Sequence, residues 1–390
     1  MMDLAYYFRP LNTEQMLMIR DFKPGCLGNA AQVHGGIFPD WEVADIVIIG
    51  CDEDRGTTGM KGAALSLDPI RKYLYRLTLP DDRAKVVDLG NLKKKDKIYD
   101  YYELLGQVTG FLLEAGKIVI LIGGSNDIAF GQYMGYDRLK KDVEYVSVDA
   151  RLDIDNSDFG INNTSYNHKI FLHSPNYLYH FSNLGYQSYF VNEADKRTIR
   201  SLHFDAIRLG LLKNDMTLAE PALRDADMAT FDMGAVRHAD GPGTNHPSPA
   251  GFSAEEICRI ARYAGISNKI SSVSFCEVNP MKDLNEQTSH LMALMIWHFI
   301  EGFYQRKNDH PNADYSNVTM HRIQMKGSIP EIIFYKSNFS ERWWMEVPYP
   351  HTSDANRFKR QLVACNYSDY QAALDDEIPD KWWTTFYKLK

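Results

Sequence analysis

Four short polar stretches, each directly after an apolar run, carry the side chains best able to do chemistry. They are GGSND (123–127), DARLD (149–153), TFDMG (230–234) and CEVNP (276–280). Asp149, Arg151 and Asp153 alternate along the second stretch, and alternate residues of a strand share one face. Two carboxylates at this spacing would suit a metal site if the residue between them were a histidine. Here an arginine takes that place.

The apolar runs before these stretches indicate buried strands. Continuous apolar segments such as 45–49 alternate with helical patterns such as 99–116 and 253–265. This alternation predicts a doubly wound parallel sheet with helices on both faces, a three-layer αβα fold. Ligands bind at the carboxyl ends of the strands in such sheets, so the four polar stretches are expected to form one site.

Three regions follow from the pattern. Residues 1–43 indicate an irregular N-terminal lead-in, and residues 44–305 an α/β domain. Residues 306–390 are rich in Trp and Tyr with little periodicity, and we expect an extension packed on the domain. Within it, RWWMEVPYP (342–350) is expected to be core, with a protein-binding patch as the alternative because Trp and Tyr are enriched at interfaces.

Composition limits which partners the protein can bind and which cellular compartment it suits. A net charge of −8 without a long basic run argues against nucleic acid or an anionic membrane as the main partner. Five scattered cysteines without a CxxC pair suit a reducing compartment. The N-terminus has no signal-peptide pattern, and the apolar run 291–300 is too short to span a bilayer. We therefore expect a cytoplasmic protein.

The four stretches, in this order, resemble the ureohydrolase superfamily of arginase, agmatinase and formimidoylglutamase, with formimidoylglutamase as the nearest match. RGTTGMKGAALSLDPIR (55–71), DGPGTNHPSPAGFSAEE (240–256) and EVNP (277–280) strengthen the resemblance. It implies an arginase-like fold, often assembled as a homo-oligomer. It also implies hydrolysis of guanidino or formimino C–N bonds by two manganese ions, which lower the pKa of a bridging water.

The resemblance implies six metal ligands from the motifs GGxH, DxHxD and SxDxD, of which this chain keeps three. The retained ligands are Asp149, Asp153 and Asp232, and the replaced positions hold Asn126, Arg151 and Gly234. One family metal corresponds to the retained acids together with Asn126, whose amide oxygen still suits a hard cation. The other metal loses the two ligands that it does not share with the first, because Arg151 and Gly234 stand at their positions.

Three interpretations of the acids stay open. The first expectation is a structural ion cluster without metal, in which the Arg151 guanidinium takes the place of the second metal and pairs with Asp149 and Asp232. The alternatives are a single manganese or magnesium ion, and a two-metal site with substitute ligands. A rescuing ligand could come from His238 or His246.

Other candidate residues also allow two interpretations. Glu277 matches the family acid that contacts the cationic end of the substrate, or it could form a salt link with Arg151. His168 falls near a family histidine proposed to transfer a proton, with a surface or capping role as the alternative. Asn126 and Asp127 could cap a helix. Cys276 lies in an apolar strand, where a thiol is usually inert.

Two functions remain from the sequence. The expected one is a ureohydrolase-family protein that has lost two-manganese hydrolysis and acts as a binding, scaffolding or regulatory protein. It could retain a small guanidino or formimino ligand. The alternative is an active, formimidoylglutamase-like amidine hydrolase that uses one metal or substitute ligands.

Overall fold

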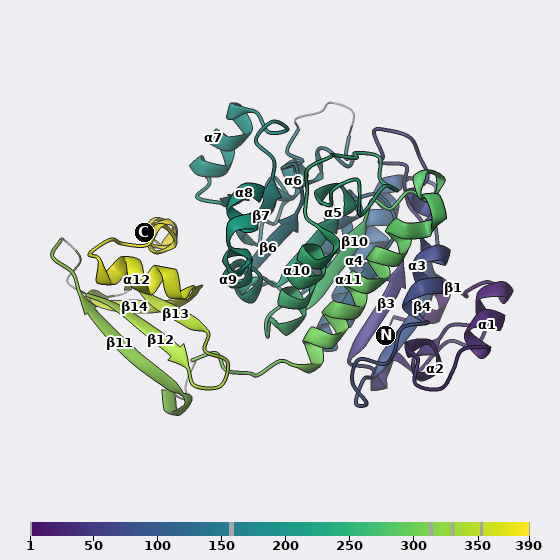
Figure 1. Cartoon of the computed structure of the whole chain (residues 1–390), viewed down its shortest axis with the longest axis horizontal. Coiled ribbons are helices and arrows are strands. Elements are labelled where there is room, and N and C mark those ends of the chain that lie inside the picture. Colours follow the sequence, from purple (N-terminus) through teal and green to yellow (C-terminus); the bar gives the residue numbers. More distant parts are fainter. Residues whose placement is uncertain are drawn as a thin grey trace.

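The computed structural model describes residues 2–155, 160–311, 315–327, 329, 331–351 and 354–389. A ten-stranded sheet crosses the body of the molecule in the order β1-β4-β3-β5-β10-β9-β6-β7-β8, with β2 also paired to β4 (Figure 1). The strands are β1 (Phe8–Arg9), β2 (Gln32–Val33), β3 (Ile46–Gly50), β4 (Val86–Leu92), β5 (Ile118–Ile122), β6 (Val143–Val148), β7 (Leu178–Tyr186), β8 (Asp205–Arg208), β9 (Met228–Asp232) and β10 (Ser272–Cys276). All pairs are parallel except β1 with β4.

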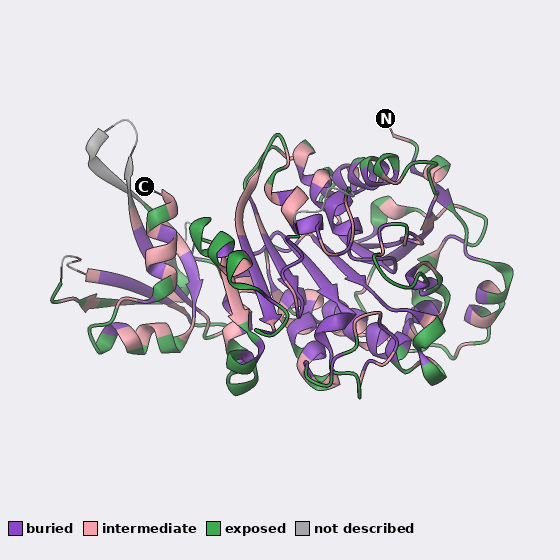
Figure 2. Ribbon diagram, turned by 90° about the horizontal axis from the view of Figure 1, so that it is seen from above, coloured by how far each residue is buried: buried purple, intermediate pink, exposed green. Residues whose placement is uncertain are grey.

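Helices cover both faces of this sheet, as the sequence predicts. The helices of the body are α1 (Thr13–Arg20), α2 (Leu27–Ala30), α3 (Leu67–Leu74), α4 (Ile98–Glu114), α5 (Ile128–Met134), α6 (Tyr166–Phe171), α7 (Glu193–Ser201), α8 (Leu209–Asn214), α9 (Ala219–Asp225), α10 (Ala254–Ile266) and α11 (Gln287–Tyr304). Along β3, Ile46 and Ile48 pack in one core with α3, α10 and α11, whereas Val47 and Ile49 pack in the other with α4 and α5. Figure 2 shows the sheet strands buried and the helices exposed on their outer sides.

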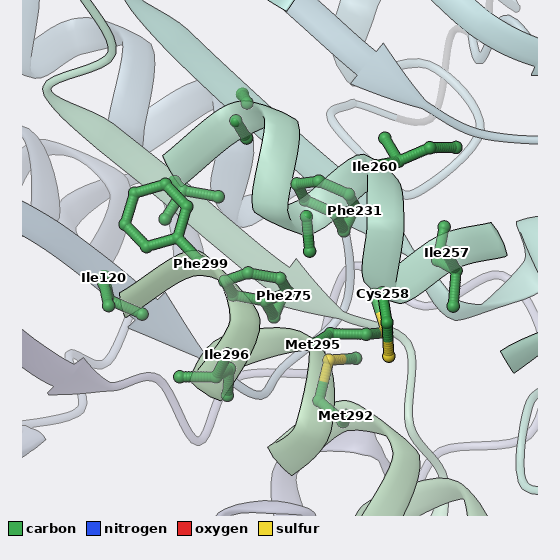
Figure 3. Packing of buried hydrophobic residues seen from close by; sticks show 14 of the residues in the cluster. Ile120, Phe231, Ile257, Cys258, Ile260, Phe275, Met292, Met295, Ile296 and Phe299 are labelled. Carbon is green, nitrogen blue, oxygen red and sulfur yellow. The ribbon is translucent and has the colours of Figure 1, made fainter. Parts of the chain in front are cut away.

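Aromatic packing in the first core holds the strands that lead to the polar stretches. Phe231 of β9 and Phe275 of β10 stack with centroids 5.0 Å apart, and Phe275 meets Phe299 of α11 edge to face at 6.4 Å (Figure 3). Phe231 directly precedes Asp232, and Phe275 lies two residues before Glu277. This rigid packing therefore fixes where the ends of β9 and β10 lie.

The apolar run 291–300 forms part of α11 and lies in the core. Met292, Ile296 and Phe299 are fully buried against the sheet. The predicted core helix is confirmed. Across the part of the chain that the structure describes, no helix has the length and apolar character needed to cross a membrane.

The C-terminal segment has more regular structure than its weak periodicity predicts. It forms a four-stranded antiparallel sheet in the order β11-β12-β13-β14, with two helices (Figure 1). The elements are β11 (Val318–Gln324), β12 (Glu331–Ser337), β13 (Trp343–His351), β14 (Asp354–Cys365), α12 (Tyr367–Leu374) and α13 (Asp380–Leu389). Both faces of β12 are buried, since Ile332 and Phe334 lie in one cluster and Ile333 and Tyr335 in another. A strand buried on both faces shows no alternation of polar and apolar residues.

Contacts from α9 join this segment to the body. Arg224 donates to the carbonyl oxygens of Trp343, at 2.8 Å, and Cys365, at 3.1 Å, and its guanidinium lies 4.6 Å over the ring of Trp344. Trp343 and Trp344 are 7% and 1% exposed. These two rings are therefore core, as expected first. A protein-binding surface elsewhere on the segment stays a prediction.

Candidate metal centre

Three buried carboxylates meet at the carboxyl edge of the sheet. Asp149, Asp153 and Asp232 each offer an oxygen, and these oxygens all lie within 4.8 Å of one another. Strand pairing explains two of the three positions, because Val148 at the end of β6 pairs with Phe231 in β9, which brings the next residues side by side. Asp153 follows in a loop, with a left-handed backbone at φ 49°. Strained backbone of this kind is often found at functional sites.

The acids are held by a few donors and are poorly neutralised. Asp149 Oδ1 accepts the backbone N–H of Arg151 at 2.9 Å, and Asp232 Oδ1 accepts that of Gly234 at 2.5 Å. Asp149 Oδ2 is buried without a hydrogen-bond partner among the described residues. Burial, above all, raises the pKa of Asp149 and of Asp232 well above the ordinary value, and repulsion between neighbouring carboxylates adds to it. Burial likewise raises the pKa of Asp153 to about 8.

Arg151 does not close the cluster in the way the sequence predicts. Its guanidinium stacks on Phe190, with Cζ 4.2 Å from the ring centroid. Within the described ranges, no ion pair shorter than 4.0 Å joins Arg151 to Asp149, Asp232 or Glu277. The predicted pairing with Asp149 and Asp232, which placed this cation where a second metal would lie, is therefore wrong, and so is the salt link to Glu277.

The backbone around Arg151 gives the physical reason. Its N–H is donated to Asp149, and its carbonyl oxygen accepts from Asn183 Nδ2 at 2.7 Å. The side chain then finds an aromatic face, which a planar guanidinium can stack on favourably. Its charge acts only at longer range, where it opposes the rise in the pKa of Asp149 and Asp153.

Asn126 lies beside the acids and not at a helix cap. Its Nδ2 donates to the Tyr166 hydroxyl at 2.9 Å and to Asp232 Oδ2 at 3.2 Å. Its Oδ1 is buried and has no partner in the described part of the chain. Asp127 is the N-cap residue of α5, directly before Ile128, but its side chain makes no cap hydrogen bond, since the carboxylate accepts from Ser125 and Tyr102. Asp127 therefore holds the cap position that the sequence predicts, without a side-chain cap, whereas the capping role expected for Asn126 is wrong.

Glu277 presents a second unpaired carboxylate oxygen near the cluster. It follows β10 with a left-handed backbone at φ 68° and is 1% exposed. Oε1 accepts from the backbone N–H of Asn126 at 2.9 Å and from Asn163 Nδ2 at 3.2 Å. Oε2 has no hydrogen-bond partner among the residues described. Burial first, and then the charge of Asp232, raises the pKa of Glu277 to about 8.

The candidate histidines of the described chain do not join the three acids. His246 is next to Gly234, because a Cβ added at Gly234 would lie 3.7 Å from the His246 Cβ. Burial lowers the pKa of both His246 and His168. The backbone N–H of His238 is donated to Ser248 at 2.7 Å. Among the described residues, no histidine offers a ring nitrogen within 4.8 Å of all three acid oxygens, so a rescuing ligand from His238 or His246 stays a prediction.

Two residues that shape the site, Asn163 and Tyr166, were not predicted from the sequence. The prediction that the Cys276 thiol is inert agrees with the structure. Asn163 holds Glu277, and Tyr166 holds Asn126. Both lie in the stretch NNTSYNHK (162–169), whose composition is that of an ordinary loop. Cys276 is fully buried, which raises the pKa of its thiol well above the ordinary value and leaves it protonated.

The donor set fits one hard divalent cation. Three carboxylates and the unpartnered Oδ1 of Asn126 supply oxygen ligands only, as Mn²⁺ and Mg²⁺ prefer. A second ion of the family type would lack its ligands, since Arg151 turns to Phe190 and Gly234 has no side chain. The residues present therefore fit one ion and not two.

Comparison with known proteins defines the class. Residues 44–301 match the family model described as Arginase family, so the chain belongs to the arginase family. Among curated relatives, the formimidoylglutamase of Rhodococcus jostii is 24% identical over 267 residues, covering 64% of this chain and 83% of the relative. That of Staphylococcus carnosus is 26% identical over 266 residues, covering 65% and 85%.

Solved structures show the same fold. A formiminoglutamase of Trypanosoma cruzi, described with Mn²⁺, has a TM-score of 0.64 at 22% identity and covers 69% of this chain and 96% of its own. The formimidoylglutamase of Bacillus subtilis has a TM-score of 0.61 at 17% identity, with coverages of 70% and 96%. The resemblance to ureohydrolases, and to formimidoylglutamases among them, is thereby confirmed together with the arginase-like fold.

Proposed function

We propose that this protein hydrolyses the C–N bond of a linear amidine, as a formimidoylglutamase does, with one divalent cation held by Asp149, Asp153 and Asp232. One observation carries the proposal. Three buried carboxylates converge within 4.8 Å, and in the described part of the chain no cationic side chain pairs with any of them. Uncompensated buried charge is costly, and a bound cation would offset the repulsion.

Manganese is the first choice for that cation, with magnesium as the alternative. The Trypanosoma cruzi relative is described with Mn²⁺, and all donors here are oxygens, which suit both ions. The sequence expectation that no metal binds has no support from the relatives. Asn126 would complete the site by turning its free Oδ1 toward the ion, giving up the present hydrogen bond from its Nδ2 to Asp232 and keeping the one to Tyr166.

A bound divalent cation would polarise the substrate and lower the pKa of a water to near neutral. The chain's own residues then bind and orient the amidine. Asn126 and Asn163 fix Oε1 of Glu277, which leaves Oε2 to accept an N–H of a cationic amidinium. Burial of this carboxylate strengthens the contact, because the local dielectric is low.

A second candidate function is a binding or regulatory protein without hydrolysis. The observation that favours it is that Arg151 and Gly234 offer no ligand for a second metal. We expect the chemistry of this family to need two ions. In that case Glu277 would still bind a cationic ligand, and the acids would stay protonated without metal.

A measurement of substrate turnover distinguishes the hydrolase from the binding protein. Chelator-treated protein is supplied with Mn²⁺ and N-formimidoyl-glutamate, and loss of substrate is followed for the wild type, Asp153→Asn and Glu277→Gln. We expect Mn²⁺-dependent turnover in the wild type and at least a hundredfold loss in both variants, with Mn²⁺ binding kept only in Glu277→Gln. Mn²⁺ binding without turnover on formimino and guanidino substrates would contradict the hydrolase and favour the binding protein.

A further inference from the structure

A cavity of about 580 Å³ lies between α7 of the body and α13 at the C-terminal end of the chain. This volume is in the range of sites that bind small molecules. The family match ends at residue 301, so α13 adds a wall that lies outside the matched residues. Among the described lining residues, Leu152 alone belongs to the segment of the acids, and none of the three acids lines the cavity.

Each of the two helical segments lines the cavity with one face, through residues three and four apart. From α7 and the residues after it come Lys196, Ile199, Arg200 and His203, and from α13 come Asp380, Trp383, Thr384 and Tyr387. His203 and Tyr387 stack at 5.9 Å with planes 19° apart, and Trp383 stacks on Tyr387 at 5.7 Å. The cavity therefore has flat aromatic surfaces on one side and two cations one helical turn apart on the other.

The acids at the cavity are already compensated. Asp205 pairs with His180 Nε2 at 3.1 Å. Asp380 is the first residue of α13, where the helix dipole favours a negative charge. Neither acid therefore calls for a cationic ligand.

The two cationic side chains of the cavity, in contrast, form only weak ion pairs. Lys196 and Arg200 share one partner, Glu193, at 2.8 Å and 3.4 Å. The Arg200 and Glu193 side chains are 67% and 66% exposed, and ion pairs between such exposed groups contribute little. A ligand carboxylate could replace Glu193 at a small cost. The charge that remains free to bind a ligand in this cavity is positive.

We propose that this cavity binds a small aromatic carboxylate. The carboxylate lies between Arg200 and Lys196, where the planar guanidinium can donate two parallel hydrogen bonds. The ring packs against Trp383 and Tyr387, with Ile199 on the other side. The site depends on the docked C-terminal segment and is independent of metal binding.

Calorimetric titration of the full chain tests the site, with 2-naphthoate as the probe and 2-naphthamide as an uncharged control of the same shape. We expect saturable binding of 2-naphthoate with a submillimolar Kd, and at least tenfold weaker binding of the amide. Arg200→Gln should weaken 2-naphthoate binding at least fivefold. Arg197→Gln is the matched control, because Arg197 is exposed on the same helix and does not line the cavity, and its Kd should stay within twofold.

Three outcomes would overturn the proposal: absence of saturable binding, equal affinity for acid and amide, or equal loss in Arg197→Gln and Arg200→Gln. Unfolding is not expected for Arg200→Gln, since the side chain is mostly exposed, and an unchanged melting temperature verifies this. As a second variant, Thr384→Phe fills the cavity from α13 and should abolish binding, and retained affinity in this variant would also overturn the assignment.

Discussion

At the scale of single residues, the acid cluster is expected to make stability depend on pH and on the proposed metal. Asp149, Asp153, Asp232 and Glu277 are buried together, and each has a pKa raised by burial, to about 8 for Asp153 and Glu277. Carboxyl groups of the unfolded chain have a pKa near 4. The folded state thus binds more protons than the unfolded state between about pH 4 and pH 8.

The metal-free protein is therefore expected to lose stability as the pH rises from about 5 to about 8. The contribution of these groups is fully present below the unfolded pKa and is lost as the pH passes through the folded pKa. Urea unfolding at pH 5 and pH 8 checks this, and saturating Mn²⁺ should remove most of the loss. Asp153→Asn is the control and should flatten the dependence. A metal-free wild type equally stable at both values would contradict it.

Replacement of Arg151 tests the corrected role of this residue. Since its guanidinium stacks on Phe190 and does not pair with the acids, Arg151→Gln should cost only about 1 kcal/mol of stability, the scale of a cation–π contact. It also removes a positive charge near the cation site, so Mn²⁺ affinity should rise severalfold. Calorimetry against Arg197→Gln, an exposed control, checks this. A tenfold fall in Mn²⁺ affinity would show that Arg151 supports the site.

The sequence could identify the acids but not the direction of Arg151. Asp149, Asp153, Asp232 and Glu277 follow apolar strands, and strand ends in a parallel sheet converge. The side chain of Arg151 depends on the loop after β6, where its carbonyl is bound by Asn183, a residue of β7. Spacing along one strand carries no information about such a contact.

At the scale of elements, the packing of β9 and β10 positions the carboxylates. Phe231 is fully buried between Phe275 and the helices of its face, and it directly precedes Asp232. Phe231→Ala should cost about 3–5 kcal/mol, because it leaves a cavity in the core. It should also weaken Mn²⁺ binding. Phe339→Ala is a matched control, since Phe339 is 61% exposed, and equal losses of stability in both variants would contradict this account.

The parallel strands and covering helices could be predicted because each repeats a pattern with a known period. The strands β11 to β14 could not, because β12 is buried on both faces and Trp343 and Trp344 point into different clusters. The two short strands β1 and β2 also join the sheet within the N-terminal lead-in, where two residues are too few to give a pattern.

At the scale of the whole molecule, Arg224 is a buried link between the body and the C-terminal sheet. It donates to two carbonyl oxygens of β13 and β14 and is 6% exposed. Arg224→Ala leaves these carbonyls without their buried donor and removes one of the two arginine partners of Glu220, the other being Arg342, which should cost about 3–5 kcal/mol. Limited proteolysis should then cleave faster between residues 305 and 317. Arg322→Ala, on exposed β11, is the control, and unchanged cleavage in Arg224→Ala would contradict the link.

The stoichiometry of Mn²⁺ on chelator-treated full-length protein, measured by calorimetry and confirmed by elemental analysis, tests the central claim most directly. The account predicts one ion per chain in the wild type and none in Asp153→Asn. The triple variant Asn126→His, Arg151→His, Gly234→Asp restores the family ligands and should bind two. Absence of Mn²⁺ and Mg²⁺ binding in the wild type, with uptake in the triple variant, would contradict the single-cation centre and favour a protein that no longer uses metal.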